Sequence, residues 1–282
     1  MYLFRYFVIF LCVGCILKPS LTMGQDATSV TQKMLSTLKS MRSLMYTGDL
    51  KERIKGKTVS EKGTFKININ PFKLYMVQIV PKKGLECLYV TGQNDGKIKV
   101  NPSSFPWVNL NLSPQGDLML ENRHHSIFDA GFAYTASILE YLLQKYQNAK
   151  DLSLNGTVKM LGSNCYYLTF NNPAYKMVSY TTQANETCLS IAKKLHLNFY
   201  SILENNPKLK ITGTIDAGTV LTVSNDYSSK MEMYVDVDKY YPVCIRVYDS
   251  KGIFEEYTFY DVSINPPFTE LDFSPENPKY GF

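Results

Sequence analysis

Apolar and polar residues alternate along most of this chain, whereas two stretches repeat their apolar residues every three or four positions. Alternation is typical of strands with one buried face, and the longer period is typical of amphipathic helices. The alternating pattern predicts strands at residues 50–57, 63–69, 73–80, 85–91, 97–100, 107–112, 117–120, 152–160, 165–170, 231–236, 241–248 and 254–263. The helical spacing covers residues 26–45 and 127–147. Because no strand–helix–strand repeat occurs, we expect an α+β fold, with helices on one face of a curved antiparallel sheet.

Residues 180–223 follow a different order from the rest of the chain. They predict a strand at 180–183, a polar turn at 184–187, a helix through Leu195, a second helix at 199–204 and a closing strand at 220–223. Pro207 ends the second helix because proline cannot continue it. This β-α-α-β segment therefore has the size and order of a small module of its own.

The strands before and after this segment share their length and style, and turn-rich stretches separate them from it. We therefore expect residues 25–175 and 228–282 to form one discontinuous domain. Residues 176–227 would be a second domain inserted at a hairpin tip, where an insertion costs little stability.

The inserted segment resembles the LysM family, whose modules bind N-acetylglucosamine polymers such as peptidoglycan. The matching residues are Val178 to Thr182, Asn185-Glu186-Thr187, Leu189 to Lys194, Asn206-Pro207 and the ending Ile215-x-x-Gly218-x-x-Leu221. The sequence departs from the family at Asn185-Glu186, where Gly-Asp or Gly-Glu is usual. Asparagine tolerates a left-handed backbone next best after glycine, so we expect the turn to be kept.

The LysM resemblance implies a glycan groove between two turns. The residues that it assigns to this groove are Asn185, Glu186, Thr187, Cys188, Leu203, Asn205, Asn206 and Pro207. A simpler interpretation is that Thr187 caps a helix and Pro207 ends one, and both roles are compatible with glycan binding.

The outer segments resemble a family of unknown function related to the LolA-like fold of periplasmic lipoprotein carriers. The matching residues are Leu88-Tyr89-Val90, Asn101-Pro102, Phe105-Pro106, Leu112-x-Pro114-x-Gly116, Asn122 to Ile127, Gly131-Phe132, Tyr248-Asp249, Gly252, Phe254, Tyr257, Phe273, Asn277, Tyr280 and Phe282. The resemblance implies a half-open barrel with helices over an apolar cavity that accommodates lipid. This link to lipid is an analogy between folds, because function depends on the site and not on the fold.

Residues 1–24 have the pattern of an export signal. Arg5 precedes a short apolar run, and small residues before Gln25 suit cleavage after Gly24. An alternative interpretation is a lipoprotein signal with Cys15 as the acylated residue. Cleavage after Gly24 would remove Arg5 and Lys18 and lower the formal net charge from +5 to +3. A nearly neutral exported chain is not typical of nucleic-acid binding, and we expect a periplasmic protein.

The remaining candidate residues give little support to metal binding or catalysis. We expect Cys87, Cys165, Cys188 and Cys244 to be buried free thiols, although an exported location would permit disulfides. The adjacent His124 and His125 lack further metal ligands nearby in the sequence, so we interpret them as turn and packing residues. We expect neither a metal nor a cofactor.

The sequence thus favours a binding protein of the cell envelope over an enzyme. The expected partners are peptidoglycan, through the inserted module, and a lipid or lipoprotein acyl chain, through the body. The alternative is a peptidoglycan-remodelling hydrolase that the module directs to its substrate. That alternative would need a catalytic pair or metal site in the outer segments, and we identify none in the sequence.

Overall fold

The computed structural model describes residues 26–145 and 151–282. Its main element is one antiparallel sheet with strand order β6-β5-β4-β3-β2-β1-β13-β12-β11-β8-β7. The strands of this sheet are β1 (Ser43–Ile54), β2 (Lys57–Asn68), β3 (Lys73–Val80), β4 (Glu86–Val90), β5 (Ile98–Asn101), β6 (Leu110–Leu112), β7 (Leu152–Met160), β8 (Ser163–Asn171), β11 (Lys230–Asp236), β12 (Pro242–Asp249) and β13 (Gly252–Ile264). The predicted export signal at residues 1–24, including Cys15, lies outside the described residues.

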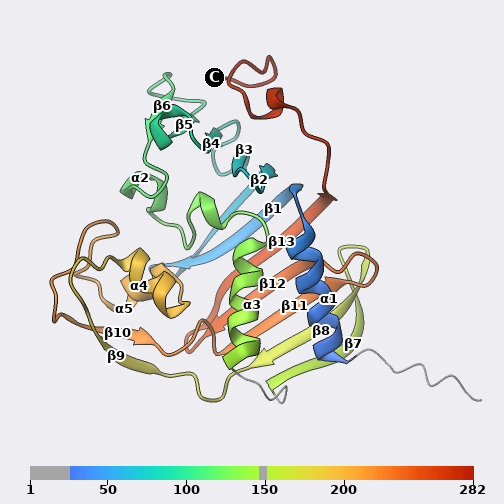
Figure 1. The fold of residues 1–282 in the computed structure, drawn as a ribbon, viewed down its shortest axis with the longest axis vertical. Coiled ribbons are helices and arrows are strands. Elements are labelled where there is room, and N and C mark those ends of the chain that lie inside the picture. The colour runs from blue at the N-terminus through green and yellow to red at the C-terminus, as the bar shows by residue number, and fades with distance from the viewer. Residues whose placement is uncertain (1–25, 146–150) are drawn as a thin grey trace, which may run out of the picture.

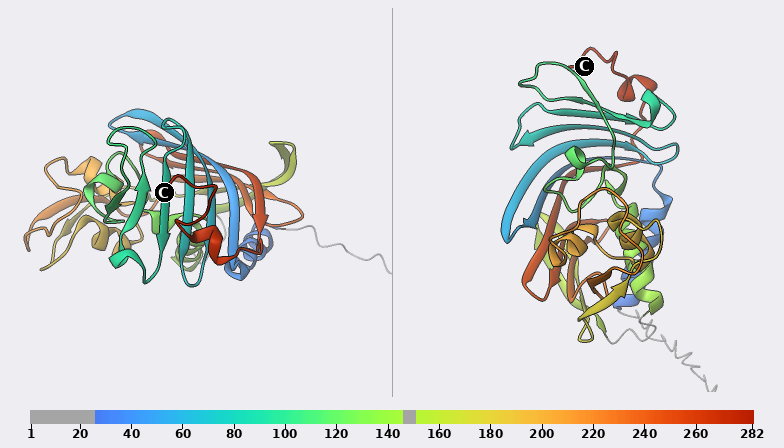
Figure 2. Two further views of the ribbon diagram at one scale, coloured as in Figure 1. Left: turned by 90° about the horizontal axis from the view of Figure 1, so that it is seen from above. Right: turned by 90° about the vertical axis from the view of Figure 1, so that its left-hand side faces the viewer.

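Two helices, α1 (Ala27–Ser40) and α3 (Ala133–Lys145), lie side by side against the concave face of this sheet (Figures 1 and 2). Helix α1 begins where the Asp26 carboxylate accepts a hydrogen bond of 2.6 Å from the backbone N–H of Ser29. Its buried residues recur at the predicted three- and four-residue spacing. The expected α+β architecture, a curved antiparallel sheet with helices on one face, is confirmed.

Aromatic side chains pack between the sheet and the start of α3. Tyr46 stacks on Phe65 with ring centroids 4.8 Å apart, and Phe132 meets Phe259 edge-on at the same distance. Such pairs contribute stability beyond the apolar area that they bury. The core therefore draws on β1, β2, β13 and the residue just before α3.

The C-terminal segment covers the outer face of β3 and β4. Tyr75 and Leu88 belong to a second apolar cluster with Phe273 of the 3₁₀ helix η4 (Glu270–Phe273), and Tyr280 stacks on Tyr75 at 3.6 Å. Neighbouring residues of a strand point to opposite faces, so these strands bury both faces. Their near-continuous apolar sequence follows from this double burial.

The segment after β8 forms a small module with a β-α-α-β order. It consists of β9 (Met177–Thr181), α4 (Cys188–Leu195), α5 (Phe199–Asn205) and β10 (Val220–Ser224), with β9 and β10 paired antiparallel. Asn171 at the end of β8 pairs with Lys230 at the start of β11, so the module emerges between two neighbouring strands. Its apolar core also includes Ile54, Leu120 and Phe254 of the body. The module is therefore packed onto the sheet domain.

Several of the predicted elements differ in the structure. The predicted strand at 117–120 is a single helical turn, α2 (Asp117–Leu120), because the Gly116 carbonyl accepts the N–H groups of Met119 and Leu120. This turn sends Met119 toward the sheet and Leu120 into the module core. Four residues are too few for period two to be distinguished from a helical turn.

The predicted helix at 127–147 is interrupted near its start. A 3₁₀ turn, η2 (Ile127–Asp129), precedes Gly131, whose φ of +84° cannot continue a helix, and α3 starts only at Ala133. Similarly, most of the predicted strand 107–112 is loop, and β6 contains only its last three residues.

The four cysteines of the described residues are buried free thiols, as predicted from their apolar surroundings. Among the described helices, none is long and apolar enough to cross a bilayer.

Candidate functional site

Two adjoining cavities lie between the concave face of the sheet and the segment that leads into α3. The first has a volume of about 120 Å³ and the second about 310 Å³. Ala130 and Gly131 line both, so the cavities adjoin at these two residues. The sequence breaks its helix here, and that break leaves the space open beneath α3.

Apolar side chains form most of the walls of both cavities. In the first cavity they come from β1 to β4, α2 and β13, and in the second from α1, β1, β2 and the segment before α3. The alternation of each strand places these residues on its concave face. The apolar side chains that line the first cavity include Leu50, Val59, Phe65, Leu74, Met76 and Met119.

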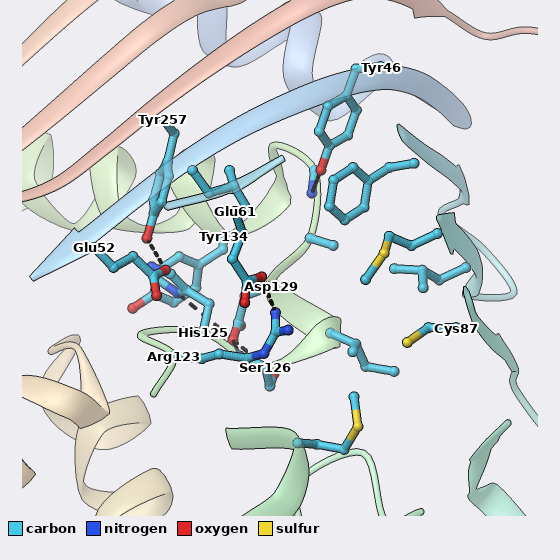
Figure 3. Close-up of a pocket in the computed structure, with 18 of the residues that line it drawn as sticks. Tyr46, Glu52, Glu61, Cys87, Arg123, His125, Ser126, Asp129, Tyr134 and Tyr257 are labelled. Atoms are coloured by element: carbon cyan, nitrogen blue, oxygen red, sulfur yellow. Dashed lines mark hydrogen bonds and ion pairs between the residues drawn. The ribbon is translucent and has the colours of Figure 1, made fainter. Parts of the chain in front are cut away.

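The first cavity also has a polar end. Figure 3 shows Glu52, Glu61, Arg123, His125, Asp129 and Tyr257 gathered on one side of it, with Tyr46 and Cys87 on the other. The cavity is thus amphipathic, with polar groups at one end of an apolar space.

Each charged group at the polar end has a partner. The Arg123 guanidinium lies 2.8 Å from the Glu61 carboxylate. Glu52 accepts hydrogen bonds from the Tyr257 hydroxyl at 2.7 Å and from the His124 backbone N–H at 2.8 Å. Because these charged groups already have ion-pair or hydrogen-bond partners, the polar end suits hydroxyl, ester or amide groups better than a strongly charged group.

Behind this end lies Glu255 of β13, whose carboxylate is 1% exposed. It contacts His124 Nδ1 at 2.9 Å and His125 Nε2 at 3.0 Å. The Asn198 side-chain amide and the Tyr227 hydroxyl also donate to it, at 2.7 and 3.0 Å. A buried carboxylate needs such a set of donors because ionisation in a dry site is otherwise costly.

The charges of this network stabilise one another. Burial alone would lower the pKa of His125, but the charge and hydrogen bond of Glu255 outweigh burial and raise it to about 9. Burial opposes ionisation of Glu255, yet the charge of His125 and the hydrogen bonds from both histidines hold its pKa well below the usual range. The phenol of Tyr257 has a raised pKa because it is buried and faces Glu255 and Glu52.

The interpretation of His124 and His125 as turn and packing residues is incomplete. His124 stacks on Tyr200 and Phe254, with centroids 4.7 and 4.1 Å away, which is packing. Both rings also bind Glu255, which the sequence did not single out. The sequence did contain one signal, a glutamate within a largely apolar strand. Because charged residues are rarely fully buried without partners, this glutamate indicated that partners would lie nearby in the fold.

The first of the two predicted glycan-binding turns contacts the chain that follows the second. The Cys188 thiol lies 3.8 Å from the Lys210 carbonyl, just beyond the second turn. Thr187 caps α4 by accepting from the Ser190 N–H at 3.1 Å, and Asn185 has the expected left-handed backbone with φ of +64°. Both structural roles foreseen for this turn are therefore present.

Several of the predicted glycan-binding side chains have structural contacts. Glu186 and Cys188 are buried, and Asn206 bonds to the backbone of Ile202 and Thr222. Asn205 bonds back to the Ser201 carbonyl, and Leu203 is half-buried in the module core. Pro207 and Asn185 are exposed. Glycan binding at this turn pair stays a prediction.

Within the described residues, no cluster of three or more histidine, cysteine, aspartate or glutamate side chains is arranged to hold a metal ion.

Solved structures resemble this fold only distantly. Lipoprotein LppX of Mycobacterium tuberculosis has 14% identity and a TM-score of 0.42, with 86% of this chain and 97% of that chain covered. A DUF1329 family protein of Desulfovibrio piger has 10% identity and a TM-score of 0.35, with 89% and 98% covered. A LolA superfamily protein of Nitrosomonas europaea has 10% identity and a TM-score of 0.33, with 89% and 98% covered. The likeness is confined to a large antiparallel sheet with few helices.

No curated protein matches the sequence. One family model does match, over residues 45–201 and 216–282, which include nearly all of the sheet, the segment 121–131 and the module except residues 202–215. The chain therefore belongs to the family described as "Protein of unknown function (DUF1571)".

Proposed function

We propose that this protein is an exported carrier or receptor that holds one acyl chain of a lipid or lipoprotein between its sheet and α3. The acyl chain occupies the two cavities that meet at Ala130 and Gly131. The polar head of the ligand lies at the end lined by Glu52, Arg123 and His125. The amphipathic lining of this cavity is the observation that carries the proposal.

Three properties of the cavity support an amphiphile as its ligand. Its larger part has a volume of about 310 Å³, at the lower end of the range of about 300–1,000 Å³ that is typical of ligand sites. Its walls are mostly apolar, so burial of an alkyl chain is favourable. Its charged groups already have ion-pair or hydrogen-bond partners, so the head group is an uncharged ester, amide or hydroxyl.

The proposal is tested with Ala130→Leu, which places a larger side chain where the two cavities meet. Ala130 has an ordinary extended backbone, with φ of −63° and ψ of 144°, so leucine is tolerated there. We expect Ala130→Leu to weaken binding of a pyrene-labelled monoacylglycerol by about tenfold or more. The measurement is fluorescence titration, together with native mass spectrometry for lipid that co-purifies with the chain from Gln25 onward.

The matched control is Ala174→Leu, the same change at an exposed alanine in the turn after β8. It should bind the probe as the unaltered protein does. Absence of both co-purified lipid and probe binding in the unaltered protein would overturn the proposal.

We also propose, as a second function, that the module binds N-acetylglucosamine polymers and so retains the protein at peptidoglycan. Its β-α-α-β order, and the contact of Cys188 in the first turn with the Lys210 carbonyl just after the second, favour this activity. Deletion of the module is a poor test because it would expose Ile54, Leu120 and Phe254 of the body, which pack against the module core. A point change at an exposed residue of the proposed groove avoids this difficulty.

Pro207→Arg, with Pro173→Arg as control, provides such a test. Both prolines are exposed and both variants gain one positive charge, but only Pro207 lies in the proposed groove. We expect Pro207→Arg to abolish co-sedimentation with insoluble peptidoglycan and Pro173→Arg to retain it. Release of soluble muropeptides in the same assay would instead favour the hydrolase alternative.

A further inference from the structure

The loop between β5 and β6 carries large apolar side chains that project from the edge of the sheet. Phe105 is 82% exposed, Trp107 76% and Val108 58%. Trp107 is the single tryptophan of the chain. Single exposed apolar residues are common on protein surfaces, but three within four positions form a contiguous apolar patch. Such a patch is typical of an interaction site.

The loop is held in place by its own backbone contacts. The Asn101 side chain accepts from the Ser103 N–H at 3.0 Å, and the Trp107 N–H donates to the Ser104 carbonyl at 2.9 Å. The Ser103 hydroxyl also donates to the Lys83 carbonyl at 3.0 Å, which ties the loop to the β3–β4 turn. The aromatic side chains are thus presented outward from an anchored loop.

The β3–β4 turn extends the same surface with apolar and basic residues. The pairing of Glu86 with Asn101 places this turn beside the loop. Val80 is 47% exposed, and both Lys82 and Lys83 are exposed. We refer to Val80, Lys82, Lys83, Phe105, Trp107 and Val108 as the aromatic tip.

The composition and shape of the aromatic tip distinguish between possible partners. Tryptophan and other aromatic residues collect at the boundary between lipid and water, while lysine ammonium groups are attracted to anionic head groups. The apolar side chains are largely exposed and line neither of the two cavities, so a broad deformable surface suits them better than the core of a close-packed protein interface. We propose that the aromatic tip docks onto a lipid bilayer that contains anionic head groups.

The position of the aromatic tip relative to the cavity agrees with this assignment. Burial raises the pKa of Glu61 in the cavity wall, and the charges of Arg123 and Lys82 oppose that rise. Lys82 of the tip therefore lies within electrostatic reach of the polar end of the cavity. A bilayer at the tip would be close to the site where we place the head group, although docking does not depend on that ligand.

Trp107 makes docking directly measurable. The chain from Gln25 onward contains every described element and is mixed with vesicles of phosphatidylcholine, with or without phosphatidylglycerol. We expect a blue shift of tryptophan emission, and quenching by lipids brominated in their acyl chains, with the anionic vesicles. An emission spectrum unchanged by both kinds of vesicle would overturn the proposal.

Phe105→Asn and Leu161→Asn form a matched pair of variants. Leu161 is 49% exposed in the β7–β8 turn, at the opposite edge of the sheet, and asparagine accepts its φ of +52°. We expect Phe105→Asn to weaken vesicle binding about tenfold and Leu161→Asn to leave it unchanged. Equal binding by both variants would contradict docking through the tip.

Two further measurements test the role of the lysines and the independence of docking from the cavity. Replacing Lys82 and Lys83 together by glutamine should remove the preference for phosphatidylglycerol. Ala130→Leu should dock normally even if it no longer binds the monoacylglycerol probe, so failure of docking and failure of the cavity proposal are distinguishable.

A blue shift that grows with protein concentration in the absence of vesicles would assign the tip to a second copy of this chain and overturn membrane docking.

Discussion

Glu186 of the module and Glu255 of the sheet are both buried glutamates whose pKa is lowered, yet their partners come from very different parts of the chain. Glu186 accepts from the Gln183 N–H at 2.8 Å, the Tyr180 hydroxyl at 2.6 Å and Lys194 at 2.9 Å. These partners lie within fourteen positions of one another in the sequence. The carboxylate thus stabilises a local turn.

The partners of Glu255 come instead from three segments that are distant from it in the sequence. His124 and His125 precede α3, Asn198 begins α5, and Tyr227 follows β10. One carboxylate therefore joins the sheet, the cavity wall and the module. The turn of the module is thus held by local contacts, whereas the cavity and the attachment of the module depend on a network that is complete only in the folded chain.

The largest effect is expected for Glu255→Gln. Gln keeps the shape but removes the charge that compensates His125, and breaking a buried pair costs about 3–5 kcal/mol. We expect Glu186→Gln to lower the free energy of unfolding by less, because its partner Lys194 is 45% exposed and can be solvated. Urea denaturation followed by circular dichroism measures both, and equal losses would contradict the comparison.

The second effect is a dependence of stability on pH that comes from His125. Its pKa rises from an ordinary 6.5 to about 9 on folding. The stabilisation is therefore complete below about pH 6.5 and is lost as pH rises through 9, with a total of up to about 3 kcal/mol. We expect His125→Asn to be less stable than the unaltered protein at pH 6 and to show a flatter profile between pH 6.5 and 9.

Glu186 makes stability depend on pH in the acid range. Its pKa falls from 4.5 to about 2, chiefly through the hydrogen bond from the Gln183 backbone, then those from Tyr180 and Lys194. Its contribution is present above pH 4.5 and is lost as pH falls toward 2. A Glu186→Gln protein whose acid profile matched that of the unaltered protein would show that this turn contributes nothing to acid stability.

The smallest effects distinguish the two helix caps of the module. Thr187 caps α4 within the module, and Thr187→Ala should cost about 1 kcal/mol. Asn198 caps α5 through the Tyr200 N–H and also donates to Glu255, so Asn198→Ala should cost about 2 kcal/mol. Thermal unfolding of the two variants side by side checks the order, and equal losses would show that Asn198 serves only as a cap.

Much of the fold could be predicted from local pattern. The helical spacing over residues 26–45 predicted α1, and Val30, Met34 and Leu38 are buried at that spacing. The order of the module followed from its turn residues, such as Asn185. The predictions were wrong at residues 117–120, because a four-residue turn has too little periodicity, and at Gly131, because the local apolar pattern continued through the break.

Little of the candidate site could be predicted in the same way. Glu52, Arg123 and Glu255 come from three different segments, and no sequence spacing relates them. Trp107 was placed within a strand because its neighbours are apolar, whereas the structure places it at φ of +58° in an exposed loop. An apolar residue has the same appearance in a sequence whether it is buried or exposed.

The order of residues alone specifies the alternating strands, the two helices of the concave face and the β-α-α-β order of the module. Each of these depends on which neighbouring residues share a face, and periodicity records that directly. Three features appear only in the tertiary structure. They are the packing of the module onto the body, the cavity at Ala130 and Gly131, and the contacts of Glu255 with both histidines. These features depend on distances between residues far apart in the chain, and those distances exist only once the curved sheet has brought the segments together.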